Sequence, residues 1–162
     1  MMRGIHSKAG LVLALGVTLM FSACANPASP SAIAFTSLSE SVETSSDVRA
    51  ETTYVIRDAA TLRTVWALVF QGRREAPAID FSKEMLVIVA LGEKATAGYG
   101  VSITGVSRRD RGLVVNVTAF APAAGCDTAA VRTFPVAVSR LRAFDGPVRF
   151  DFTRTTRPCG GR

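Results

Sequence analysis

The chain has 162 residues, a formal charge of +6 and one histidine, His6. Because His6 lies in a leader that is expected to be removed, the mature protein would have no imidazole. Catalysis by a Ser–His or Cys–His pair is then excluded, and the usual zinc-binding spacings are missing. The basic residues are mostly arginine and are scattered, whereas nucleic-acid binding would need them clustered among aromatic residues. The sequence therefore predicts no nucleic-acid partner.

Residues 1–23 have the pattern of an export signal: Arg3 and Lys8 precede a short apolar stretch, and small residues follow it. The stretch is shorter than the roughly 20 residues of a transmembrane helix. The sequence FSAC at 21–24 resembles the lipobox of bacterial lipoproteins, in which cleavage leaves a lipidated cysteine, here Cys24, as the new N-terminus. Alternatively, an ordinary signal peptidase cuts nearby and Cys24 has no role. In the first case acyl chains would anchor the protein to a membrane without spanning it.

Residues 24–48 are rich in Ser, Ala, Thr and Pro and form a predicted flexible tether, although Ile33–Leu38 could add an edge strand. The remaining residues, 49–162, are one domain by length. Ala25 rather than aspartate follows Cys24, which favours the outer over the inner membrane. The expected location is thus the cell envelope, with the domain lipid-anchored and facing the periplasm.

The first elements of the domain are a strand at 52–57 and a helix over about 59–71. Asp58 is a good N-cap, and Gly72 marks the end of the helix. Apolar residues recur at helical spacing and define one stripe that should pack against a sheet, namely Leu62, Val65, Trp66, Val69 and Phe70. Trp66, the only tryptophan, is expected in the core and not in a ligand site.

Further strands follow the helix. The run 85–91 is apolar without alternation, so both of its faces should be covered and it should be central. Alternating residues predict strands at 101–104, 113–120 and 148–152, and Pro135 borders another that ends near Leu141. The predicted fold class is α+β: a small, mostly antiparallel sheet of five to six strands with one packed amphipathic helix. Arg108–Arg111 occupies a turn, and its pattern favours a solvated hairpin tip over a contact with phosphate or a lipid headgroup.

Little catalytic machinery remains in the mature chain. Six acidic residues could form carboxylate pairs, but nothing in their spacing brings two together: Asp80, Glu84, Glu93, Asp110, Asp127 and Asp145. The clustered acids that calcium needs are missing, and no cofactor motif is found. Cys126 and Cys159 can pair in an oxidising compartment, and a disulfide there would hold the Gly-rich C-terminus. We therefore expect no enzyme, no metal and no cofactor.

Several motifs in order resemble the protease complex subunit PrcB family, in its C-terminal domain: WALVF at 66–70, IDFSKEMLVIVALG at 79–92, TAGYGVSI at 96–103, LVVNV at 113–117 and TFPVAV at 133–138. The resemblance covers about residues 58–152. Ala97 departs from the family's T-G-G-Y pattern, which puts in doubt any role that needs a free backbone there. The family name comes from a lipoprotein associated with a secreted subtilisin-like protease complex, so the resemblance implies association with a partner rather than an activity.

The segment 92–100 has two interpretations. In one it is only a turn, in which Gly98 and Gly100 take backbone angles that side chains forbid and Tyr99 packs its ring. In the other, Thr96, Gly98, Tyr99 and Gly100 at a loop tip bind a protein. The sequence accordingly predicts a non-catalytic envelope lipoprotein that serves an exported protein as an accessory or binding subunit, and the resemblance implies a protease complex as that partner. The alternative is a module that binds a small ligand or envelope polymer, and a carboxylate-dependent hydrolase comes third.

Overall fold

The computed structural model describes residues 31–38 and 45–159, which form one helix and eight strands. The elements in chain order are β1 (Ser31–Ala32), β2 (Phe35–Ser37), β3 (Thr52–Ile56), α1 (Ala59–Phe70), β4 (Glu84–Ala90), β5 (Gly100–Arg109), β6 (Gly112–Pro122), β7 (Val136–Arg142) and β8 (Val148–Arg157). The predicted leader, Cys24 and part of the predicted tether lie outside the described residues. Within the described part, α1 is too short to cross a membrane.

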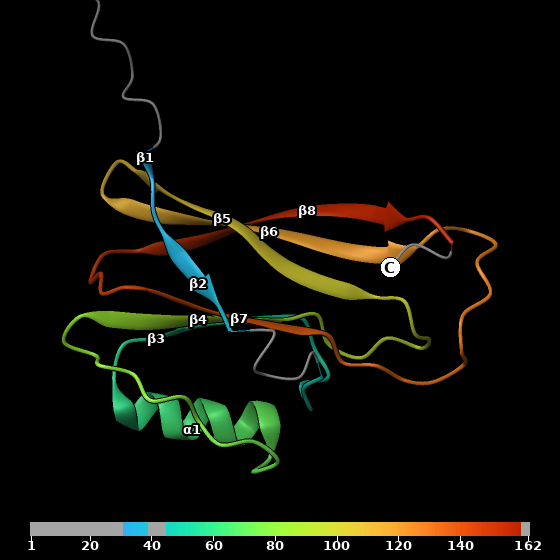
Figure 1. Ribbon diagram of the computed structural model, residues 1–162, viewed down its shortest axis with the longest axis horizontal. Coiled ribbons are helices and arrows are strands. Elements are labelled where there is room, and N and C mark those ends of the chain that lie inside the picture. The colour runs from blue at the N-terminus through green and yellow to red at the C-terminus, as the bar shows by residue number, and fades with distance from the viewer. Residues whose placement is uncertain (1–30, 39–44, 160–162) are drawn as a thin grey trace, which may run out of the picture.

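The strands form two stacked sheets, and α1 covers the outer face of one of them (Figure 1). One sheet has the order β1-β5-β6-β8 and the other β2-β7-β4-β3. All neighbouring strands are antiparallel except β6 and β8, which are parallel. The predicted α+β class is confirmed, with more strands than the five to six expected and with two sheets in place of one.

The helix forms where the sequence predicts it. The Asp58 carboxylate accepts a hydrogen bond from the Thr61 amide at 2.7 Å and so caps the first turn. Gln71 takes a left-handed conformation, with φ of 47°, and ends the helix. Four residues of the predicted stripe are buried on the sheet: Leu62, Trp66, Val69 and Phe70. Trp66 belongs to this core, and its indole N–H donates to the Arg74 carbonyl at 3.0 Å.

Strand β4 is covered on both faces, as its continuous apolar sequence predicts. Alternate side chains, Leu86, Ile88 and Ala90, pack in the core under α1. The intervening ones, Met85, Val87 and Val89, pack in a second core between the two sheets. The inward-facing residues of β6 and β8 complete that second core: Leu113, Val115, Val117, Val148, Phe150 and Phe152. Their alternation is the one the sequence predicts.

The folded part also includes residues from the predicted tether. Ser31 pairs with Arg108 of β5, and Phe35 pairs with Leu141 of β7, so the segment 31–38 crosses from one sheet to the other. Ile33 and Phe35 are half-buried against the core between the sheets. This burial explains why a Ser- and Ala-rich segment is ordered, and it agrees with the edge strand considered for Ile33–Leu38. Two short strands thus precede the predicted boundary at residue 49.

The strands of both sheets run between two opposite ends of the sandwich (Figure 1). At the hairpin end lie the turn between β5 and β6 and the turn between β7 and β8. At the loop end lie the segment 91–99 between β4 and β5 and the crossover 123–135 between β6 and β7. Strand β6 has 11 residues and a rise of about 3.3 Å per residue, which places the two ends roughly 35 Å apart.

Candidate functional site

The loop end brings together segments that are distant in the sequence. Ala90 is paired with Val136 in neighbouring strands, so the segment after β4 and the crossover before β7 leave the sheet side by side. Likewise, Pro122 is paired with Arg157, so the crossover begins next to the end of β8. All four predicted partner-binding residues, from Thr96 to Gly100, lie here.

Hydrogen bonds join the segment 91–99 to the crossover. The main chains of Lys94 and Thr133 exchange two hydrogen bonds, of 2.8 and 3.0 Å. The Ala97 amide donates to the Ala129 carbonyl at 3.0 Å, and the Thr133 hydroxyl donates to the Thr96 carbonyl at 3.0 Å. The two connections thus form one structure, which we call the loop platform (residues 91–99 and 123–135).

The glycines of the segment have different roles. Gly92 has φ of 73°, and a Cβ atom there would lie 2.6 Å from the Arg49 carbonyl oxygen, so only glycine fits. Gly98 has φ of 91°, as the turn interpretation predicts. For Gly100 that prediction is wrong: its φ is not in the left-handed region, because it begins β5 opposite Phe120. Ala97 also needs no left-handed backbone, so its departure from the T-G-G-Y pattern is accommodated.

Tyr99 is half-buried and lies directly before β5, not at a loop tip. Its ring centroid is 6.0 Å from the Lys94 ammonium nitrogen. The residue lines a cavity of about 110 Å³ together with Leu91, Ala119 and Arg154. Ligand pockets usually have about 300–1,000 Å³, so this cavity is small for an organic ligand.

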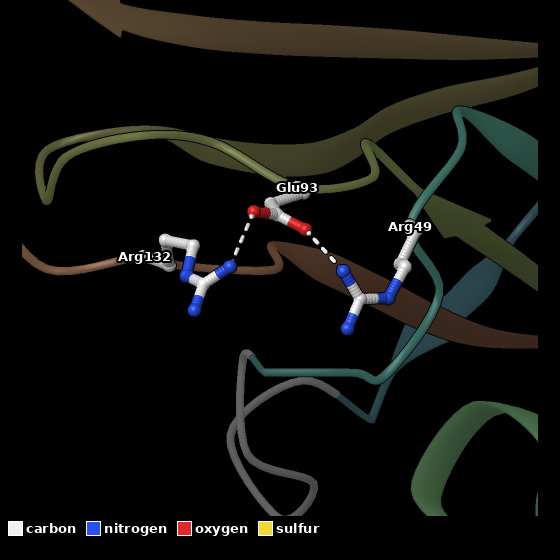
Figure 2. A network of polar contacts seen from close by, with 3 residues as sticks. All are labelled: Arg49, Glu93 and Arg132. Carbon is white, nitrogen blue, oxygen red and sulfur yellow. Dashed lines mark hydrogen bonds and ion pairs between the residues drawn. The ribbon is translucent and has the colours of Figure 1, made fainter.

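Ion pairs balance the acidic groups beside the platform. The Glu93 carboxylate lies between two guanidinium groups, 3.0 Å from Arg49 and 3.3 Å from Arg132 (Figure 2). This arrangement ties the platform to the residues that precede β3. Close by, one guanidinium nitrogen of Arg154 contacts both carboxylate oxygens of Glu51, at 2.8 and 2.9 Å. Both acids are thus matched by cations.

The two cysteines meet at the same end. Cys126 lies in the crossover and Cys159 follows β8, and their Cα atoms are 5.1 Å apart in the geometry of a disulfide. Such a bond fastens the crossover to the end of β8, 33 positions later in the chain. That the bond forms in the exported protein stays a prediction, with a test given in the Discussion.

The displaced pKa values belong to structural contacts. Hydrogen bonds from Thr61 lower the pKa of Asp58 at the start of α1. A hydrogen bond from the Lys83 side chain, with further ones from Ser82, lowers the pKa of Asp80 in the turn before β4. Both carboxylates lie away from the loop platform. Across residues 31–38 and 45–159, no three Asp, Glu, Cys or His side chains gather as metal ligands would.

Sequence reasoning missed the crossover, the second half of the platform. Its Val131 side chain is 51% exposed, which is unusual for a large apolar residue and is shared in the described chain only by Leu68 on α1. The signal was present, because the apolar run AAV at 129–131 interrupts a polar connection. It was not recognised because short apolar runs in loops are usually buried.

Fold and site together define a helix-covered, two-sheet α+β domain with a hydrogen-bonded loop platform at one end. A family model described as PrcB C-terminal matches residues 85–142, from β4 to β7, and this match confirms the resemblance to the PrcB family. The matched segment contains the whole platform. Neither a curated protein nor a solved structure matches the chain. The family match is consistent with a subunit that associates with a protease complex.

Proposed function

We propose that this chain is a lipid-anchored protein of the cell envelope that binds an exported partner, a component of a protease complex, through the loop platform. Cys24 carries the lipid in this proposal, and the chain contributes binding rather than catalysis. The observation that carries the proposal is the fixed geometry of the platform inside the family-matched segment. It rests on main-chain hydrogen bonds that do not depend on a partner.

Preorganisation favours a binding role. A loop that must become ordered on binding loses affinity, and a loop already ordered avoids that loss. The hydrogen bonds from Lys94, Ala97 and Thr133 fix the platform in advance. Gly92 adds to this, because its main chain lies against that of Arg49 without space for a side chain.

The chemistry of the platform suits a protein surface. Interfaces have an apolar centre surrounded by polar groups, and a few residues supply most of the binding energy. Val131 is exposed between Ala130 and Arg132, both also exposed. The partly exposed ring of Tyr99 lies at the same end, in a cavity too small for most organic ligands. These features favour a macromolecular partner over a small molecule.

The experiment is cross-linking in intact cells, followed by purification and mass spectrometry of the cross-linked protein. Val131→Asp places a charge in the centre of the proposed interface and should lower recovery of the partner at least about tenfold, as expected for a central interface residue. Leu68→Asp is the matched control, because Leu68 is 57% exposed on α1, away from the platform. The amount of partner recovered with Leu68→Asp should equal the amount recovered with the unchanged protein.

Tyr99→Phe and Tyr99→Ala add a second pair of variants. The phenylalanine variant keeps the half-buried ring and should retain the partner, whereas the alanine variant should lose it. Thermal unfolding of every variant checks that the domain remains folded. Equal partner recovery from Val131→Asp and Leu68→Asp would refute the platform as the binding surface. Cleavage of a peptide by the purified chain itself would refute the non-catalytic role.

A further inference from the structure

The hairpin end carries an excess of positive charge. We define the basic face as residues 108–112 and 143–149, which include four arginines and two aspartates: Arg108, Arg109, Arg111, Arg149, Asp110 and Asp145. Among the described residues, Arg109 and Arg111 have no ion-pair partner, and both are exposed. The loop end is also basic, with Arg49, Lys94, Arg132, Arg154 and Arg157. Three of these arginines are there paired with Glu51 or Glu93.

The basic face surrounds an open depression of about 400 Å³. Arg109, Asp110, Arg111 and Arg149 line it, together with the apolar side chains of Pro147 and Val148. Arg149 is paired with Asp151 at 3.4 Å. Arg108 is held beside it, with its guanidinium group 4.9 Å from the centre of the Phe144 ring. Arginine groups around a partly apolar floor match the chemistry of phosphate groups above a hydrocarbon layer.

The path of the chain brings this face toward the anchor. Because β1 is antiparallel to β5, the chain enters the domain at Ser31, opposite Arg108. Only six residues lie between Cys24 and Ser31, and the seven residue steps that join them span at most about 25 Å. The loop end, roughly 35 Å farther along the sandwich, is the part most distant from the anchor.

We infer that the basic face docks on the anionic headgroups of the membrane that holds the anchor, in place of the solvated hairpin tip that the pattern of Arg108–Arg111 alone favours. The inference rests on the proposed lipidation of Cys24. Each basic residue close to an anionic surface contributes about fivefold to binding, and the attraction decays over the Debye length of about 10 Å. Docking at this end points the loop platform away from the membrane, where an exported partner is accessible.

Hydrogen exchange on the full mature lipoprotein tests the docking. The protein is reconstituted into vesicles of phosphatidylcholine alone or of phosphatidylcholine with phosphatidylglycerol. We expect slower exchange at residues 108–113 only on the anionic vesicles, with no change at 91–99, and high salt should abolish the difference. The double variant Arg109→Ala/Arg111→Ala should lose about 25-fold of that added protection, fivefold for each arginine.

The matched control is Arg49→Ala/Arg132→Ala, which removes the same charge at the loop end and should keep the protection. Equal exchange on both kinds of vesicle, or an equal loss in the control, would overturn the inference. Soluble glycerol 3-phosphate added to neutral vesicles should not protect the hairpin. Protection by this compound would instead indicate a site for a free phosphate ester.

The outcomes separate this inference from the proposed function. If mass spectrometry finds no acyl chains on Cys24, the docking inference is refuted, while partner recovery through Val131 is tested independently. If the protein is lipidated and shows no protection, only the docking is wrong. If protection is found but Val131→Asp retains the partner, the platform is wrong and the docking remains.

Discussion

Gly92 provides a direct test of how the loop platform is built. Its replacement by alanine introduces a Cβ atom 2.6 Å from the Arg49 carbonyl oxygen and 2.8 Å from the Ala50 carbonyl carbon. Both are main-chain atoms, so the segment before β3 must move. The substitution also forces alanine into a left-handed conformation, with φ of 73°.

A second glycine separates these two effects. Gly72 has the same φ of 73°, but nothing lies within 4 Å of the position of its Cβ. Gly72→Ala should therefore lower the free energy of unfolding only through the left-handed backbone, by about 1–2 kcal/mol. Gly92→Ala adds the displacement of packed atoms, about 1–3 kcal/mol, for a total of roughly 2–5 kcal/mol. The difference between the two variants measures the close approach alone.

Urea unfolding of the mature protein, followed by circular dichroism, gives the free energy of unfolding of each variant. Gly100→Ala is the second control, because its Cβ would lie 3.8 Å from a Phe120 ring carbon, an ordinary contact, and its φ is not left-handed. Its stability should be unchanged or slightly higher. Equal losses for Gly92→Ala and Gly72→Ala would refute the close packing of the platform on the residues before β3.

Three other perturbations have distinct expected outcomes. Cys126→Ser should lower the free energy of unfolding by about 3–4 kcal/mol, the chain-entropy value for a loop of this length; free thiols in a non-reducing peptide map of the unchanged protein would contradict the pairing. Glu93→Gln should cost less than about 1 kcal/mol in the same assay, because both of its arginine partners are exposed; a larger loss would mean that the ion pairs hold the platform. Asp58 has a lowered pKa in the folded state, so its charge stabilises the fold above pH 3.8 and ceases to do so as the pH falls through the folded value. Asp58→Asn keeps the cap without the charge. The free energy of unfolding of this variant should therefore be lower than that of the unchanged protein near neutral pH, and the two values should converge in acid.

Local patterns were sufficient to predict the individual elements. Residues 58–72 include the N-cap, the apolar stripe and the stop signal, and the helix forms at Ala59–Phe70. The unbroken apolar run at 85–91 correctly predicted a strand covered on both faces. In both cases the signal lies within about a dozen residues, a range over which spacing alone determines which side chains share a face.

Strand partners could not be predicted in the same way. Alternation in β6 and β8 shows which side chains face inward but not that the two strands are parallel neighbours, because that pairing depends on a crossover through the other sheet. The two-sheet arrangement was missed for this reason. That residues 31–38 belong to the folded part was also predicted only in part. Their folding depends on burial of Ile33 and Phe35 between sheets, which a single sequence does not display.

The candidate site was predicted only in its first half for a related reason. Tyr99 and its flanking glycines form a recognisable local motif, whereas the crossover becomes relevant only because Ala90 and Val136 are neighbours in the sheet. The same pairing gives the site its orientation. The platform and the hairpin end lie at opposite ends of the strands, so in the proposed arrangement a partner at the platform would lie about one strand length from the membrane.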